Sequence, residues 1–139
     1  MMFRISQIDH IVLRVRDIDT MLRFYVEVLG CTLELTQQDL GLYQLRAGQA
    51  LIDLVPVDGK LGRMGGAAPG QEGLNLDHFC LRIEPFEPEQ LSSWLAGKGA
   101  SPSEVARRYG AEGYGPSLYF SDHEGNLVEL KGPADGLPG

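Results

Sequence analysis

A short strand-like motif occurs twice in this chain and constrains its fold more than any other feature. The motif reads IDHIVLRV at residues 8–15 and LDHFCLRI at residues 76–83. A second motif closes each half, with LIDL at residues 51–54 and LVEL at residues 127–130. Each half therefore begins with a strand that carries a histidine and ends with a strand that carries a carboxylate. We interpret this pattern as an internal duplication of one structural module.

The first half predicts the element order strand, helix and three strands. Apolar residues recur at three- and four-residue steps between Met21 and Leu29, which predicts an amphipathic helix with Phe24 and Tyr25 in the core. Asp17 or Asp19 would cap the start of this helix, and Gly30 would end it in a left-handed conformation. The strands are expected at residues 8–15, 32–36, 42–47 and 50–57.

The second half predicts the same βαβββ order. A helix is expected at residues 87–96, with Pro88 in its first turn. The remaining strands are expected at residues 76–83, 101–106, 117–121 and 127–131, with a glycine-rich loop at residues 107–116.

These patterns predict one α+β domain over residues 1–139. Module one covers residues 8–57 and module two covers residues 76–131. A glycine-rich linker or a long mobile loop is expected at residues 58–75, where the apolar periodicity stops. The tail at residues 132–139 is expected to be disordered.

The composition excludes several classes of protein. The net charge is −7 and the pI about 4.8, which argues against nucleic acid or an anionic membrane as a partner. No apolar run is long enough for a transmembrane helix or a secretory signal, so we expect a cytoplasmic protein. Cys31 and Cys80 form no CxxC pair, and both are expected to be buried, reduced thiols.

Four side chains at equivalent positions of the repeat are competent to bind metal. His10 matches His78, and Asp53 matches Glu129. Imidazole and carboxylate ligands suit one divalent ion such as Zn, Ni, Mn, Fe or Co. Asp53 is one methylene shorter than glutamate, so it would either ligate the ion directly or orient a water or a ligand histidine.

Three further residues near this pattern are given local roles. Asp9 and Asp77 alternate to the face opposite their neighbouring histidines, so we expect them to bond local backbone or cap a turn. His123 belongs to the turn SDHEGN and is left outside the site.

The chain resembles the vicinal oxygen chelate superfamily, which includes glyoxalase I, bleomycin-resistance proteins and extradiol dioxygenases. The resemblance rests on IDHIVLRV, FYVEVLG, LIDLV, LDHFCLRI and SLYFSDHEGNLVEL. It implies paired βαβββ modules whose curved mixed sheet, with flanking helices, cups a metal site, and it implies a homodimer. The implied ligands are His10, His78 and Glu129, and Asp53 occupies a fourth position that is often Glu in glyoxalase I. The C-terminal segment most resembles the small glyoxalase-domain proteins.

The resemblance also implies a function. A lactoylglutathione lyase-like enzyme would bind a small oxygen-chelating substrate at the metal and abstract a proton with Glu129 or Asp53. Residues of the glycine-rich segment, Arg107, Arg108, Tyr109 and Tyr114, would bind an anionic substrate. The alternatives are an Fe(II) extradiol-type ring-cleaving dioxygenase, a bleomycin-resistance-type binding protein without catalysis, and a thiol transferase acting on an antibiotic.

Overall fold

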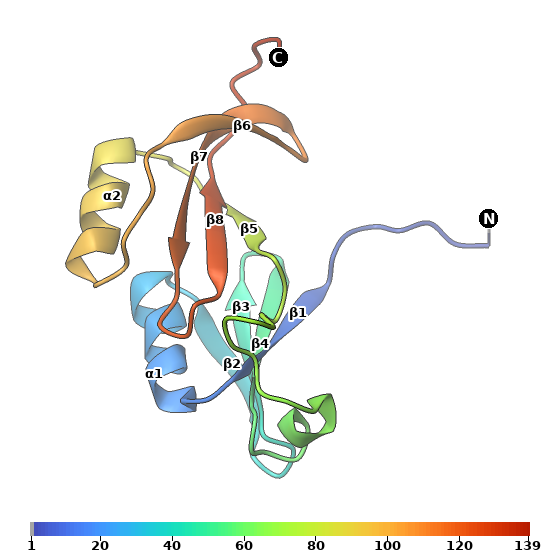
Figure 1. Cartoon of the computed structure of the whole chain (residues 1–139). Coiled ribbons are helices and arrows are strands. Elements are labelled where there is room, and N and C mark those ends of the chain that lie inside the picture. The colour runs from blue at the N-terminus through green and yellow to red at the C-terminus, as the bar shows by residue number, and fades with distance from the viewer. Residues whose placement is uncertain (1) are drawn as a thin grey trace. The chain divides into compact units, whose positions relative to one another are not determined.

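The chain folds into two compact units that divide between Asn75 and Leu76. The computed structural model describes residues 2–139. Each unit contains one four-stranded mixed sheet and few helices (Figure 1). The predicted α+β class and the paired βαβββ modules are therefore confirmed.

The first unit follows the order predicted from residues 8–57. Its elements are β1 (His10–Val15), α1 (Ile18–Arg23), a π-helical turn (Phe24–Val28), β2 (Thr32–Gln37), β3 (Leu42–Ala47), β4 (Ala50–Pro56) and a 3-10 turn (Gly62–Gly65). The strand order in the sheet is β1-β4-β3-β2. β1 runs parallel to β4, and the other neighbours are antiparallel. This arrangement places the two predicted site strands of the module side by side.

The helix of the first unit begins and ends as the sequence predicts. The Asp17 carboxylate accepts a hydrogen bond of 3.1 Å from the backbone N–H of Thr20 and so caps α1. Gly30 follows the π-helical turn with a φ of 77°, a left-handed conformation that glycine adopts without a steric penalty. Phe24 and Tyr25 are 1% and 0% exposed, which confirms them as core residues.

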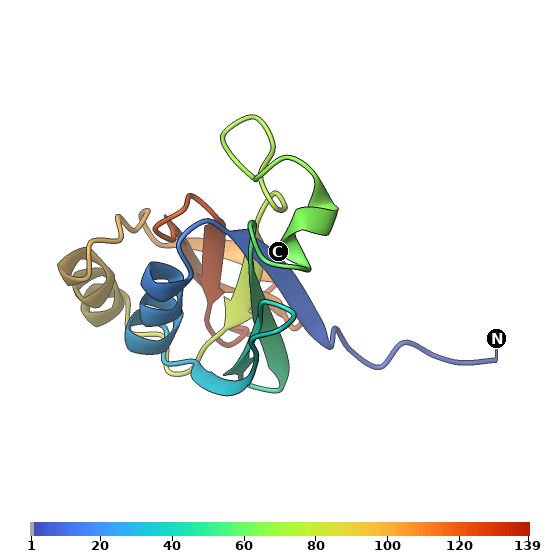
Figure 2. The ribbon, with the colours of Figure 1, turned by 90° about the horizontal axis from the view of Figure 1, so that it is seen from below.

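Residues 58–75, expected to form a linker or a long mobile loop, contain the 3-10 turn Gly62–Gly65 and a loop (green in Figure 2), and Arg14 of β1 binds this segment. The Arg14 guanidinium donates to the carbonyl oxygens of residues 65, 66 and 67 at 3.1, 2.7 and 3.0 Å. The Asn75 side chain accepts from the Arg14 backbone N–H and donates to its carbonyl, each at 3.0 Å. Local composition could not reveal these bonds, since the arginine that orders the segment lies in β1.

The second unit repeats the topology of the first. Its elements are β5 (Phe79–Arg82), α2 (Pro88–Gly97), β6 (Ala106–Gly110), β7 (Gly113–Ser121) and β8 (Leu127–Lys131). The strand order is β5-β8-β7-β6, with β5 parallel to β8. The strand expected at residues 101–106 is displaced to β6, and the expected loop at residues 107–116 is instead the β6–β7 hairpin. Its glycines had suggested a loop, yet all three of them, Gly110, Gly113 and Gly115, lie within paired strands.

The tail at residues 132–139, expected to be disordered, makes hydrogen bonds to the β6–β7 hairpin. Arg107 donates to the Asp135 carboxylate at 2.6 Å and to the Leu137 carbonyl at 2.8 Å, while the Asp135 N–H donates to the Tyr114 carbonyl at 2.8 Å. The Arg107 guanidinium lowers the pKa of Asp135 to about 2. The tail is therefore held against the β6–β7 hairpin.

Within the described residues, no helix has the length and apolar character needed to cross a membrane.

Candidate metal-binding residues

The second unit brings His78 and Glu129 together. His78 directly precedes β5, and its Nε2 lies 3.5 Å from Oε1 of Glu129 on β8. Glu129 is paired across the sheet with Cys80 on β5 and with Tyr119 on β7. The short distance from His78 to Glu129 places the imidazole at the end of this row. The Glu129 side chain is 9% exposed and the His78 side chain 35%.

The first unit carries an equivalent arrangement. Asp53 on β4 is paired with Val12 on β1 and with Gln44 on β3, and His10 begins β1. Gln44 Nε2 lies 3.4 Å from both Asp53 oxygens. Asp53 is 3% exposed, and its negative charge contributes to raising the pKa of His10. The repeat therefore places His10 and Asp53 in the same relation to their sheet as His78 and Glu129.

Each histidine is oriented by the aspartate that precedes it. His10 Nδ1 lies 2.7 Å from the Asp9 carboxylate, and His78 Nδ1 lies 2.6 Å from the Asp77 carboxylate. The hydrogen bond to Asp9 is also the largest cause of the raised pKa of His10. Because a carboxylate can only accept, Nδ1 donates and Nε2 is left with its lone pair for a metal ion. The expectation that these aspartates bond only local backbone or cap a turn is wrong.

The chemistry of these side chains fits a divalent metal. Among residues 2–139, no Lys or Arg forms an ion pair with Glu129, although this carboxylate is buried. A buried carboxylate without a cationic partner is costly, and a metal ion would supply the missing positive charge. No group of three or more His, Cys, Asp or Glu side chains gathers in the part of the chain that the structure describes. Each unit supplies two candidate ligands.

Tyr119 is a site residue that sequence reasoning did not place, and it lies beside Arg108, which was expected to bind an anionic substrate. The Tyr119 ring meets the His78 ring edge-on at 5.4 Å. Burial raises the pKa of Tyr119, and its hydrogen bond to Glu129 raises it further. The Arg108 guanidinium lies 4.8 Å over the Tyr119 ring. Tyr119 and Ser117 are two residues apart on β7, so their side chains lie on the same face of the sheet. That this face carries Glu129 follows only from the pairing of β7 with β8.

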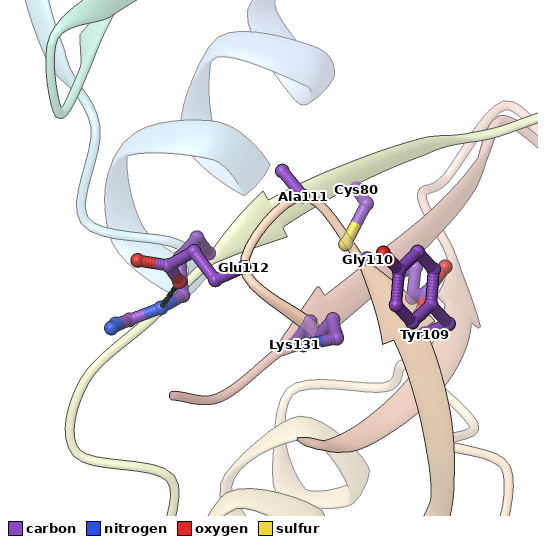
Figure 3. A pocket seen from close by; sticks show the side chains of 8 residues that line it. Cys80, Tyr109, Gly110, Ala111, Glu112 and Lys131 are labelled. Carbon is purple, nitrogen blue, oxygen red and sulfur yellow. Dashed lines mark hydrogen bonds and ion pairs between the residues drawn. The ribbon is translucent and has the colours of Figure 1, made fainter. Parts of the chain in front are cut away.

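The predicted substrate-binding residues do not all lie on one face of the sheet, because adjacent residues of a strand point to opposite faces. Arg107 lies 4.5 Å from the Tyr114 ring and binds the tail, on the face opposite Arg108. Tyr109 lies 5.1 Å from Tyr114 and lines a pocket of about 190 Å³. Figure 3 shows Tyr109 and Cys80 in this pocket. Glu129 lines it as well. A substrate role for Arg107, Tyr109 and Tyr114 stays a prediction.

The two cysteines differ in exposure. Cys31 is buried as expected, whereas Cys80 is exposed, so the expectation of two buried thiols is wrong for Cys80. Desolvation raises the pKa of both thiols to about 11. Without a metal ion, Cys80 is therefore a neutral thiol beside Glu129.

Comparison with known proteins connects this arrangement to a family. A model described as the glyoxalase/bleomycin resistance protein/dioxygenase superfamily matches residues 7–130. The virulence protein STM3117 of Salmonella typhimurium is 30% identical over 131 residues, which cover 91% of this chain and 83% of that protein. Its crystal structure matches with a TM-score of 0.77 and 29% identity, covering 95% of this chain and 100% of the other.

Two further solved structures share the fold at lower sequence identity. The fosfomycin resistance protein FosX of Listeria monocytogenes matches with a TM-score of 0.68 and 18% identity, covering 95% of this chain and 97% of the other. Lactoylglutathione lyase of Agrobacterium tumefaciens matches with a TM-score of 0.64 and 19% identity, covering 91% and 93%. At these identities the likeness concerns the fold alone.

Proposed function

Because this chain belongs to the glyoxalase/bleomycin resistance protein/dioxygenase superfamily, we propose that it is a divalent-metal-dependent enzyme. Its substrate is a small molecule that chelates the metal through neighbouring oxygens, and its reaction is a lyase- or isomerase-type proton abstraction. The metal ligands are His10, His78 and Glu129, brought together within one chain or across a homodimer. A bound divalent ion would act as a Lewis acid at such a site.

The repeated aspartate–histidine pair is the observation that carries this proposal. A histidine that serves only packing needs no fixed ring orientation. Here both modules fix the ring in the same way, with Nδ1 bound to the preceding carboxylate. Metal-ligating histidines characteristically donate their second ring nitrogen to a carboxylate or carbonyl. The presence of this pair at the equivalent position of both modules therefore supports a ligand role for both histidines.

The two buried carboxylates, Glu129 and Asp53, would have different roles in this reaction. Glu129 faces His78 and accepts a hydrogen bond from Tyr119, which orients it as a ligand. Asp53 is the candidate base, since Gln44 holds its carboxylate from one side without neutralising its charge. The proton that leaves the substrate carbon would move to a carboxylate oxygen of Asp53, or of Glu129 if that oxygen is not bound to the metal.

Metal binding by the purified protein tests the proposal directly. Protein freed of metal with a chelator is expected to take up about one divalent ion per chain when dialysed against Zn, Ni, Mn, Fe or Co in turn. Equilibrium dialysis with elemental analysis gives the stoichiometry and the affinity. If no divalent ion binds more tightly than about 100 μM, a dissociation constant worth only about 5.5 kcal/mol, the enzyme proposal is wrong. A metal-independent binding protein would then be the better interpretation.

Asp77→Asn tests the aspartate–histidine pair. The substitution keeps the shape of the side chain but weakens the acceptor of the His78 Nδ1 proton, so metal affinity is expected to fall about 10- to 100-fold. Asp39→Asn is the matched control, because Asp39 is an exposed aspartate in the turn between β2 and β3. Competition with a metal-binding dye measures both affinities. Equal affinities for the two variants would mean that Asp77 does not act through His78.

A further inference from the structure

A second row of polar side chains crosses the second sheet beside the Glu129 row. Lys131 on β8 is paired with Arg82 on β5 and with Ser117 on β7. These residues lie two positions along their strands from Cys80, Glu129 and Tyr119, so both rows face the same side. The sheet thus presents an acidic row and, next to it, a basic row.

The Lys131 side chain is enclosed. The residue is 5% exposed and lines the pocket shown in Figure 3. Glu129 lines the same pocket. The hairpin makes room for it with glycines, because a Cβ at Gly110 would lie 2.9 Å from Lys131 Cδ and Cε. A Cβ at Gly115 would lie 3.1 Å from Lys131 Nζ. The glycines that made this segment resemble a loop therefore accommodate a lysine.

The Lys131 ammonium has no carboxylate partner within ion-pair distance among residues 2–139, although acidic side chains lie nearby. Glu112 lines the same pocket but receives a 2.7 Å hydrogen bond from Arg82. Asp135 is bound by Arg107 at 2.6 Å. Buried charges are normally paired, so an ammonium that remains unpaired in a pocket indicates that its partner comes from a ligand.

Ser117 and Arg108 are polar residues beside Lys131 on this sheet. Ser117 is fully buried, and Arg108 donates to its hydroxyl and to its carbonyl at 2.9 Å. Arg108 forms no ion pair among the described residues and lies over Tyr119, between the two rows. A cationic pair formed by Lys131 and Arg108 therefore borders the pocket side of the sheet.

We propose that Lys131, supported by Arg108, binds an oxyanion group of the substrate, either a carboxylate or a phosphate-type group. This inference rests on the proposed function, since the same substrate would reach the metal through Glu129. Two residues along a strand correspond to ~7 Å. The substrate is therefore a small anion whose charged group lies about that distance from its metal-chelating oxygens.

Inorganic phosphate is the probe, and the metal-free protein is the sample. An NMR titration at about pH 8, where an ordinary imidazole is neutral, is expected to give saturable shifts of the amides of Gly110, Gly115 and Lys131. Lys131→Met keeps the length of the side chain and removes its charge, so phosphate affinity is expected to fall at least about tenfold. Lys98→Met, at an exposed position that directly follows α2, is the matched control and is expected to leave the affinity unchanged.

Two further variants separate the possible failures. His78→Ala is expected to leave phosphate affinity within about twofold, because it removes a proposed metal ligand and leaves the lysine in place. Lys131→Arg is expected to retain binding, which keeps the test valid if Lys131→Met does not fold. Shifts that map away from the hairpin, or equal affinity of Lys131→Met and the wild type, would overturn the inference. A protein that binds phosphate in this way but takes up no metal would instead refute only the proposed function.

Discussion

His78→Ala is expected to weaken divalent metal binding at least about a hundredfold. Structural zinc ions held by four protein ligands bind with roughly 10–16 kcal/mol, or about 3 kcal/mol per ligand. Loss of about 3 kcal/mol corresponds to about a hundredfold in affinity. The substitution also leaves Glu129 without the imidazole that lies 3.5 Å from its carboxylate. Isothermal titration with the metal that the wild type binds most tightly measures the difference.

His123→Ala is the matched control for this prediction. His123 is the third histidine of the chain and lies in the exposed turn before β8, six residues from Glu129 in sequence. We expect its removal to change metal affinity by less than about threefold. If both variants lose affinity equally, binding occurs through surface histidines. If neither does, His78 is not a ligand.

The repeated motifs predicted which strands carry the candidate site residues, because two duplicated modules fold with the same strand pairing. His10 and His78, together with Asp53 and Glu129, occupy equivalent sequence positions, and the two sheets share one strand order. Equivalent residues therefore occupy equivalent rows. Whether one metal ion draws ligands from both modules stays a prediction, since sequence equivalence does not give the distance between modules.

Asp9 and Asp77 were misjudged because strand alternation was applied beyond the strands. β1 begins at His10, and β5 begins at Phe79, one residue after His78. Both aspartates therefore lie just outside the strands, although the Asp9 carbonyl still accepts a hydrogen bond of 3.1 Å from the Leu51 N–H. Their side chains turn toward the neighbouring imidazole, and the short Asp side chain reaches Nδ1.

Arg107 and Arg108 were treated alike because composition cannot assign strand parity. Once residues 107–116 form a hairpin, adjacent residues lie on opposite faces. Arg107 then meets Asp135 in the tail, and Arg108 meets Tyr119 in the site row. The register of β6 on β7 is a tertiary feature, and the glycines that Lys131 requires hide the strand pattern in the sequence.

Phe24→Ala is expected to destabilise the protein by about 3–5 kcal/mol. Phe24 is 1% exposed and begins the π-helical turn after α1, with its ring 5.5 Å from the ring of fully buried Tyr25 in an edge-on contact. Removing the ring deletes buried apolar surface and leaves a cavity that the neighbouring sheet can only partly fill. Unfolding in urea, followed by circular dichroism, measures the loss.

Val26→Ala is the control on the same turn. Val26 is 38% exposed, and the substitution removes only two methyl groups. Its effect is expected to stay within about 0.5 kcal/mol, because alanine is the better helix former and little buried surface is lost. Similar destabilisation by both variants would mean that the helical turn itself, and not the Phe24 ring, limits stability. A small effect of Phe24→Ala alone would show that the core closes over the vacated space, which a rigid sheet packed against α1 should prevent.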